Sequence, residues 1–274
     1  VEIREAVLGP THPDLANGLR NLAALLALSG RVQDGRALLA RAQEIYEAAL
    51  GTEHPAVAGV LSALADFDRR LRQGSLAVAS LRTALDIRMK AFDARHPEVA
   101  LTLADLGGAY LAEGNADMAL EQFRSAHAII AASFGPGHRY TAQALNNMAG
   151  AESALGQHDA AERRYREALA IQREALGEEH PDLATTWGNL ASLLRDAGRA
   201  GEALEAARTA ATILERRFLG PASTVLEGQD SERLSRRDSF LFAVDLALEA
   251  AAGAASAGER ELLIAEALHA AQLA

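Results

Sequence analysis

The sequence predicts an all-α protein, an α-solenoid of antiparallel helix pairs, and three observations support this prediction. A His-Pro dipeptide recurs in steps of 42 residues, at His12, His54, His96 and His180, with His138 filling the remaining position. Columns of small residues recur at the same step. Hydrophobic residues make up 49% of the chain but aromatic residues only 4%, so Ala and Leu must build the core. A fixed period of this length is typical of one supersecondary unit stacked many times.

The helix pair can be placed in the first repeat. An apolar stripe at helical spacing predicts a first helix over about 13–29, and a second stripe predicts another over about 32–50. The break between them, around Gly30, recurs at Gly114, Gly156 and Gly198, whereas the second repeat shifts its glycine to Gly74.

Three columns are identical in all five repeats, and the two alanine columns among them predict where helices cross at close range. Their members are Ala16, Ala58, Ala100, Ala142 and Ala184; Ala42, Ala84, Ala126, Ala168 and Ala210; and Ile45, Ile87, Ile129, Ile171 and Ile213.

The His-Pro step marks the start of each first helix. Proline suits the first helical turn, where its missing N–H would be unpaired anyway. The five histidines suggest metal ligands, but packed helices lie roughly 8–10 Å apart, whereas metal–nitrogen bonds are about 2 Å long. We therefore expect the histidines to cap helices and predict no metal site.

The repeat resembles a known family. Ala119, Phe123 and Ala126, which follow Leu106-Gly107 and Tyr110, resemble the tetratricopeptide repeat (TPR). Leu-Asn-Asn-Met-Ala at 145–149 and Ala-Leu-Gly-Glu-Glu-His-Pro-Asp at 175–182 are similar to its kinesin-light-chain type. The resemblance implies a right-handed superhelix whose first helices line a concave groove.

The register divides the chain. Five 42-residue TPR units are expected over 10–218, preceded at 1–9 by the second helix of a truncated repeat. A loop is expected at 219–230, around Gly220-Pro221. A degenerate or capping helix pair follows at 231–274, with helices at about 231–252 and 259–274. Residues 266–274 resemble the junction between TPR arrays and the caspase-like CHAT domain of bacterial proteins, which implies a missing downstream domain.

Candidate binding residues lie on the first helices. Asn21, Asn147 and Asn189 share one column, next to Arg20 and Asn146. In kinesin-light-chain-like repeats this asparagine faces the groove and holds a peptide backbone, because an amide offers both donors and an acceptor. The alternative is an asparagine bonded to its own neighbours. The column is interrupted at Ala63 and Asp105, so the asparagines do not form a continuous ladder.

A second candidate column lies one turn further along the same helices. It contains Arg69, Ser153 and Arg195, and its arginines can receive acidic groups of a peptide.

Composition excludes several classes of function. The net charge of -10 argues against a binder of nucleic acid or of anionic membranes. Cysteine is absent, which excludes a disulfide framework, a thiol nucleophile and thiolate metal sites. No run of 18 apolar residues and no signal peptide occur. We expect a cytoplasmic protein with no cofactor.

Three functions remain open at this point. No phosphate-binding loop, nucleophile elbow or distinctive carboxylate pair is found, so we expect no catalytic residue in this region. The first possibility is a scaffold that binds a protein or peptide segment in the concave groove. The second is the sensor region of a bacterial TPR-CHAT peptidase. The third is a purely structural oligomerisation module.

Overall fold

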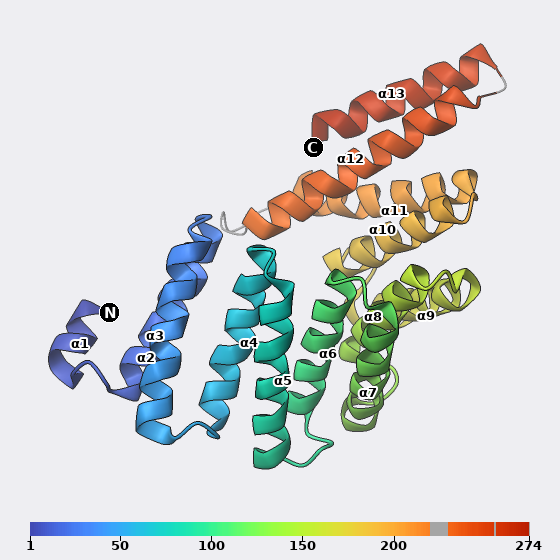
Figure 1. The fold of residues 1–274 in the computed structure, drawn as a ribbon. Helices are drawn as coiled ribbons and strands as arrows, with labels where there is room; N and C mark the ends of the chain where they lie inside the picture. The colour runs from blue at the N-terminus through green and yellow to red at the C-terminus, as the bar shows by residue number, and fades with distance from the viewer. Residues whose placement is uncertain (220–229, 255, 274) are drawn as a thin grey trace. The chain divides into compact units, whose positions relative to one another are not determined.

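The computed structural model describes residues 1–219, 230–254 and 256–273. The described residues form thirteen α-helices and no strand. The chain divides into two compact halves, Val1–Phe134 and Gly135–Ala274. The predicted all-α solenoid class of antiparallel helix pairs is confirmed within each half (Figure 1).

The N-terminal half contains one short helix and three helix pairs. Its helices are α1 (Glu2–Leu8), α2 (Pro13–Leu28), α3 (Val32–Leu50), α4 (Pro55–Arg70), α5 (Gly74–Ala91), α6 (Pro97–Ala112) and α7 (Ala116–Phe134). The pairs α2/α3, α4/α5 and α6/α7 correspond to the first three repeats. Within each pair, the helix that follows the repeated histidine is called the first helix and its partner the second.

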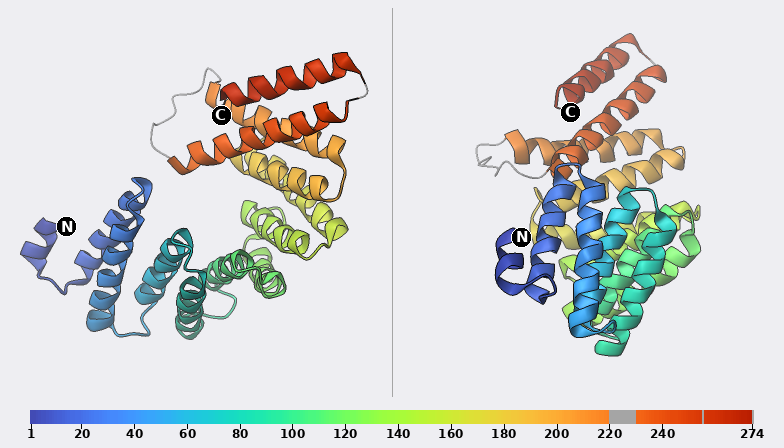
Figure 2. Two further views of the ribbon diagram at one scale, coloured as in Figure 1. Left: turned by 45° about the horizontal axis from the view of Figure 1, so that its top comes forward. Right: turned by 60° about the vertical axis from the view of Figure 1, so that its left-hand side comes forward.

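The C-terminal half contains three more pairs, α8/α9, α10/α11 and α12/α13 (Figure 2). Its helices are α8 (Arg139–Ala154), α9 (His158–Leu176), α10 (Pro181–Asp196), α11 (Ala200–Leu219), α12 (Asp230–Ala252) and α13 (Ala257–Leu273). The loop expected at 219–230 begins and ends in helical residues, and 220–229 lie outside the described residues. None of the helices in the described part of the chain is long and apolar enough to cross a membrane.

The repeated histidines are helix caps. In all five repeats the histidine Nδ1 accepts a hydrogen bond from the backbone N–H two residues later, at 3.1–3.2 Å. This bond satisfies one of the donors that a helix N-terminus leaves unpaired. The predicted capping role is confirmed.

The turn inside each pair needs one residue with a left-handed backbone. Gly30, Gly114, Gly156 and Gly198 have φ values of 72–79°. The expectation that Gly74 takes this place in the second repeat is wrong, because Arg72 adopts φ 58° there. Gly74 instead begins α5, where an added Cβ would lie 1.8 Å from the carboxylate of Glu113. Gly74 therefore leaves space for a side chain of the next repeat.

Small residues let the helices cross closely. Ala16, Ala42 and Ala58 have no exposed surface. At one crossing even alanine is too large, because a Cβ on Gly107 would lie 2.6 Å from the Phe123 ring.

Buried polar side chains distinguish one repeat from the next. Asp68, on a first helix, is 1% exposed and pairs with Arg36 of the preceding second helix. Glu152, two repeats further on, is equally buried and accepts from Arg164 Nε at 2.8 Å on both oxygens. The equivalent position carries Leu26, Tyr110 or Leu194 in the other repeats.

Candidate binding surface

The predicted binding residues lie on first helices, and first helices of neighbouring repeats contact each other. These contacts join α4 to α6 and α8 to α10. The N-terminal half carries Arg20 and Asn21 on α2 and Arg69 on α4, and the C-terminal half carries Asn146, Asn147 and Ser153 on α8 and Asn189 and Arg195 on α10. Each half therefore has its own face of first helices, which we call the first-helix face.

In the C-terminal half, two asparagines meet across α8 and α10. Asn189 Nδ2 donates to Asn146 Oδ1 at 3.1 Å, and both residues are half-buried. The bond joins neighbouring columns of the repeat rather than one column, because the two residues are separated by 43 positions instead of 42. Asn147 and Ser153 are half-buried beside this pair along α8.

Arg195, near the C-terminal end of α10, contacts two neighbouring side chains. Its guanidinium carbon lies 4.9 Å from the centre of the Phe242 ring of α12. Its Nε lies 3.5 Å from the carboxylate of Asp196. Sequence reasoning missed Phe242, because α12 lies outside the 42-residue register that aligns the other helices.

In the N-terminal half, two arginines reach over the next first helix. Arg20 Nη2 lies 3.8 Å from the position of a Cβ on Gly59 of α4, and Arg69 Nη1 lies 3.9 Å from that of Gly108 of α6. A glycine on the neighbouring helix thus makes room for each guanidinium. Neither arginine forms an ion pair or hydrogen bond with a residue in the described ranges 1–219, 230–254 and 256–273. Asn21 is exposed beside Arg20.

A buried arginine enters this half from a second helix. Arg88 of α5 donates from Nη1 to Ser62 Oγ at 2.8 Å and to Thr102 Oγ1 at 2.6 Å. Its Nη2 lies 3.4 Å from Glu98 Oε2. Burial lowers the pKa of Arg88, and the negative charges of Glu98 and Asp105 counteract this effect. The sequence analysis did not single out Arg88. A signal was present, because Arg88 is the charged member of a column that otherwise holds Tyr46, Ile130, Gln172 and Leu214.

Asp105 interrupts the asparagine column in the same half. Removal of water by the surrounding protein raises the pKa of its carboxyl group, and the positive charges of Arg88 and Arg69 partly oppose this shift. The carboxyl group of Asp105 therefore interacts electrostatically with both Arg88 and Arg69.

Family models decide what kind of repeat this is. A model for the tetratricopeptide repeat matches residues 15–56. Another tetratricopeptide repeat model matches three overlapping segments, 57–132, 99–174 and 140–216. The chain belongs to the tetratricopeptide repeat family. TPR chains of this kind are generally non-catalytic and mediate protein–protein interaction.

Solved structures support the kinesin-light-chain type. The TPR chain is 27% identical to a Podosopora anserina protein of nearly identical TPR-like repeats, described as a kinesin light chain, with a TM-score of 0.65 over 75% of this chain and 97% of that one. BtubC (BKLC) of P. vanneervenii is 21% identical and shows the shared fold alone, with a TM-score of 0.61 over 92% and 90% of the two chains.

A more distant match shares the fold alone. A signal transduction ATPase with numerous domains (STAND) from Pyrococcus horikoshii, a protein with a tetratricopeptide repeat sensor, is 16% identical, with a TM-score of 0.66 over 94% of this TPR chain and 36% of that protein. No curated protein sequence matches the TPR chain.

Proposed function

We propose that this TPR chain is a protein-interaction module in which each first-helix face can bind an extended segment of a partner protein. The observation that carries the proposal is the bond from Asn189 to Asn146 across α8 and α10. It fixes both amides and leaves the Asn146 amino group free to donate and the Asn189 oxygen free to accept. A peptide backbone presents the complementary pair, one C=O and one N–H per residue.

A buried amide on a second helix supports the same site. Gln172 of α9 is 4% exposed, and its Oε1 has no hydrogen-bond partner among the described residues. Gln172 occupies the register position of Arg88, whose partners Ser62 and Thr102 correspond to Asn146 and Thr186 two repeats later. We infer from this register that the unused acceptor lies near the asparagine pair, where a ligand donor could satisfy it only after the buried Gln172 side chain moves.

The N-terminal half contributes charge. Neither Arg20 nor Arg69 forms an ion pair within 4.0 Å in the part of the chain that the structure describes, although the charge of Arg69 lowers the pKa of the Asp105 carboxyl group. Both guanidinium groups lie over a neighbouring first helix. We propose that they receive acidic side chains of a segment that binds the N-terminal half, because guanidinium–carboxylate bonds are charge-assisted and often bidentate.

The asparagine pair gives a direct test. Short random peptides displayed on phage are selected on the wild-type chain, and the affinities of the enriched peptides are then measured against Asn146→Ala/Asn189→Ala. We expect binding to weaken about tenfold or more, because two backbone-directed hydrogen bonds are lost. Gln33→Ala, an exposed amide on a second helix, should bind like the wild type. Equal affinity for all three proteins, with unchanged helical circular dichroism, would exclude this face as the site.

A further inference from the structure

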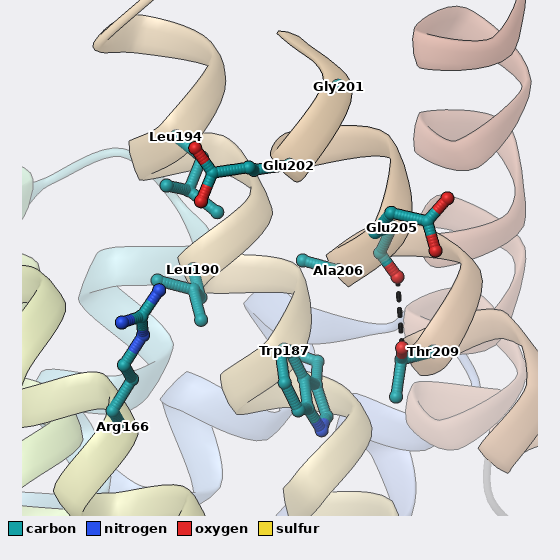
Figure 3. A pocket seen from close by; sticks show the side chains of 9 residues that line it. All are labelled: Arg166, Trp187, Leu190, Leu194, Gly201, Glu202, Glu205, Ala206 and Thr209. Carbon is teal, nitrogen blue, oxygen red and sulfur yellow. Dashed lines mark hydrogen bonds between the residues drawn. The ribbon is translucent and has the colours of Figure 1, made fainter. Parts of the chain in front are cut away.

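A cavity of about 440 Å³ opens in the C-terminal half between α9, α10 and α11 (Figure 3). It is lined by Arg166, Trp187, Leu190, Leu194, Gly201, Glu202, Glu205, Ala206 and Thr209. Trp187, the single tryptophan of the chain, is half-buried at one end of it. The cavity shares no residue with the first-helix face proposed above.

Comparison with the first repeat shows how the lining of the cavity differs between repeats. The floor residues Leu190 and Leu194 correspond to Leu22 and Leu26, so the floor is the same in both repeats. Ala206, however, corresponds to Leu38, which packs partly buried against the core of the N-terminal half. The fifth repeat therefore carries a smaller side chain at this wall of the cavity than the first repeat does.

A second exchange places an aromatic surface in the cavity. Trp187 corresponds to four leucines, Leu19, Leu61, Leu103 and Leu145, all of which are buried. The fifth repeat therefore replaces a buried leucine with a larger ring that stays partly exposed. Gly201, where other repeats carry Gln33, Ser75 or Asp117, removes a further side chain at the rim.

The charges at the rim already have partners. Arg166 Nη2 lies 2.6 Å from Glu162 Oε1, and Arg199 Nη2 donates to Glu202 Oε2 at 2.5 Å. Glu205 pairs with Arg208. A charged occupant would have to compete with these pairs, whereas an uncharged apolar occupant would mainly have to displace water from the indole ring, since Leu190 and Leu194 are only 2% and 3% exposed.

We propose that this cavity is a second protein-binding site, which receives one uncharged, phenylalanine-sized side chain from a partner protein. The volume is within the range of about 300–1,000 Å³ that is usual for ligand pockets. An aromatic occupant would also pack against the Trp187 ring, an arrangement that favours aromatic pairs beyond the area they bury.

The single tryptophan makes the test direct. N-acetyl-L-phenylalanine amide is titrated into the isotope-labelled chain, and the indole N–H signal of Trp187 is followed by NMR. We expect this signal to shift and saturate with a dissociation constant in the millimolar range, because so small a probe can gain little binding free energy. N-acetyl-L-alanine amide, which lacks the ring, should leave the signal in place.

The matched variant comes from the chain itself. Ala206→Leu restores the residue of the first repeat, fills the cavity and should weaken the probe at least tenfold. Ala37→Leu, at an exposed alanine of α3, should bind like the wild type. If Ala206→Leu lost its helical signal, Gly201→Gln would narrow the rim of the cavity instead. This change introduces the residue found at Gln33 in the first repeat, and no atom lies within 4 Å of a Cβ added at Gly201.

Three results would overturn the proposal. The Trp187 signal would not respond to the phenylalanine probe, it would respond equally to the alanine probe, or it would respond equally in the variant with the filled or narrowed cavity.

Discussion

Arg36 Nε lies 2.5 Å from Oδ1 of Asp68, a carboxylate with only 1% of its surface exposed. Arg36 belongs to the second helix of one repeat and Asp68 to the first helix of the next, so the bond joins two repeats. A buried carboxylate is tolerated only when it is paired. The pair therefore makes the packing of α3 against α4 depend on one arginine.

Removing this arginine should be costly. We expect Arg36→Ala to lower the free energy of unfolding by about 3 kcal/mol, at the low end for buried pairs because a third of the Arg36 side chain remains exposed. Arg36→Leu/Asp68→Leu should recover most of the loss, since apolar pairs often replace buried ion pairs without penalty. Urea unfolding monitored by circular dichroism measures both. Arg31→Ala, which removes an exposed pair with Asp34, should change stability by less than about 1 kcal/mol; an equal effect of Arg31→Ala and Arg36→Ala would contradict this account.

Arg72 is a strained residue that the chain's other repeats avoid. Its φ of 58° is unfavourable for a residue with a Cβ, and the four equivalent turns carry glycine. Arg72→Gly should therefore raise the free energy of unfolding by about 1 kcal/mol, visible as a higher melting temperature. A lower melting temperature would mean that contacts of the Arg72 side chain stabilise the fold by more free energy than the backbone strain at this residue costs.

Gly107 and Phe123 should be energetically coupled. Gly107→Ala introduces a methyl group 2.6 Å from the Phe123 ring and should cost about 1–3 kcal/mol. Adding Phe123→Leu, the residue of the first two repeats at this position, should make the double variant more stable than the sum of the single effects. Gly188→Ala on α10, where no atom lies within 4 Å of an added Cβ, should instead stabilise its helix. Additive effects at 107 and 123 would argue against the contact.

Asp105 should give the N-terminal half a specific pH dependence. The pKa of the Asp105 carboxyl group is raised above 3.8 in the folded chain. At pH values between 3.8 and this raised pKa, the folded state therefore binds more protons than the unfolded state. Over that window stability should fall as pH rises, and the loss should persist at neutral pH. Asp105→Asn, the residue of the fourth and fifth repeats, should remove this component in a series of unfolding curves from acidic to neutral pH. An unchanged slope in the variant would show that Asp105 titrates alike in both states.

The 42-residue step predicted the helix pairs and their capping histidines, because each is a local feature that the repeat copies five times. The TPR family was predicted from the resemblance of individual repeat residues, such as Ala119, Phe123 and Ala126, to that family. The step could not predict the bond between Asn146 and Asn189, since that bond joins neighbouring columns across the packing of two helices. It also misplaced the left-handed residue of the second repeat, because a glycine nearby seemed a better choice than Arg72.

Other features were missed because they depend on differences between repeats. The lining of the Trp187 cavity includes two small residues, Ala206 and Gly201, which come together with the indole ring only when the neighbouring helices are in place. Arg88 was hidden in a column that was treated as apolar packing. The roles of the first-helix candidates, and the resemblance of 266–274 to a CHAT junction, stay predictions.

The bond between Arg36 and Asp68 also restricts how this array could be rearranged. If the 42 residues from His54 to Arg95 were excised, the register would be preserved, but Tyr110 would take the place of Asp68 opposite Arg36. The guanidinium would then face a phenol instead of a carboxylate. Repeats that share one backbone pattern are thus not interchangeable modules, and gain or loss of a repeat by recombination would require a compensating change at the new junction.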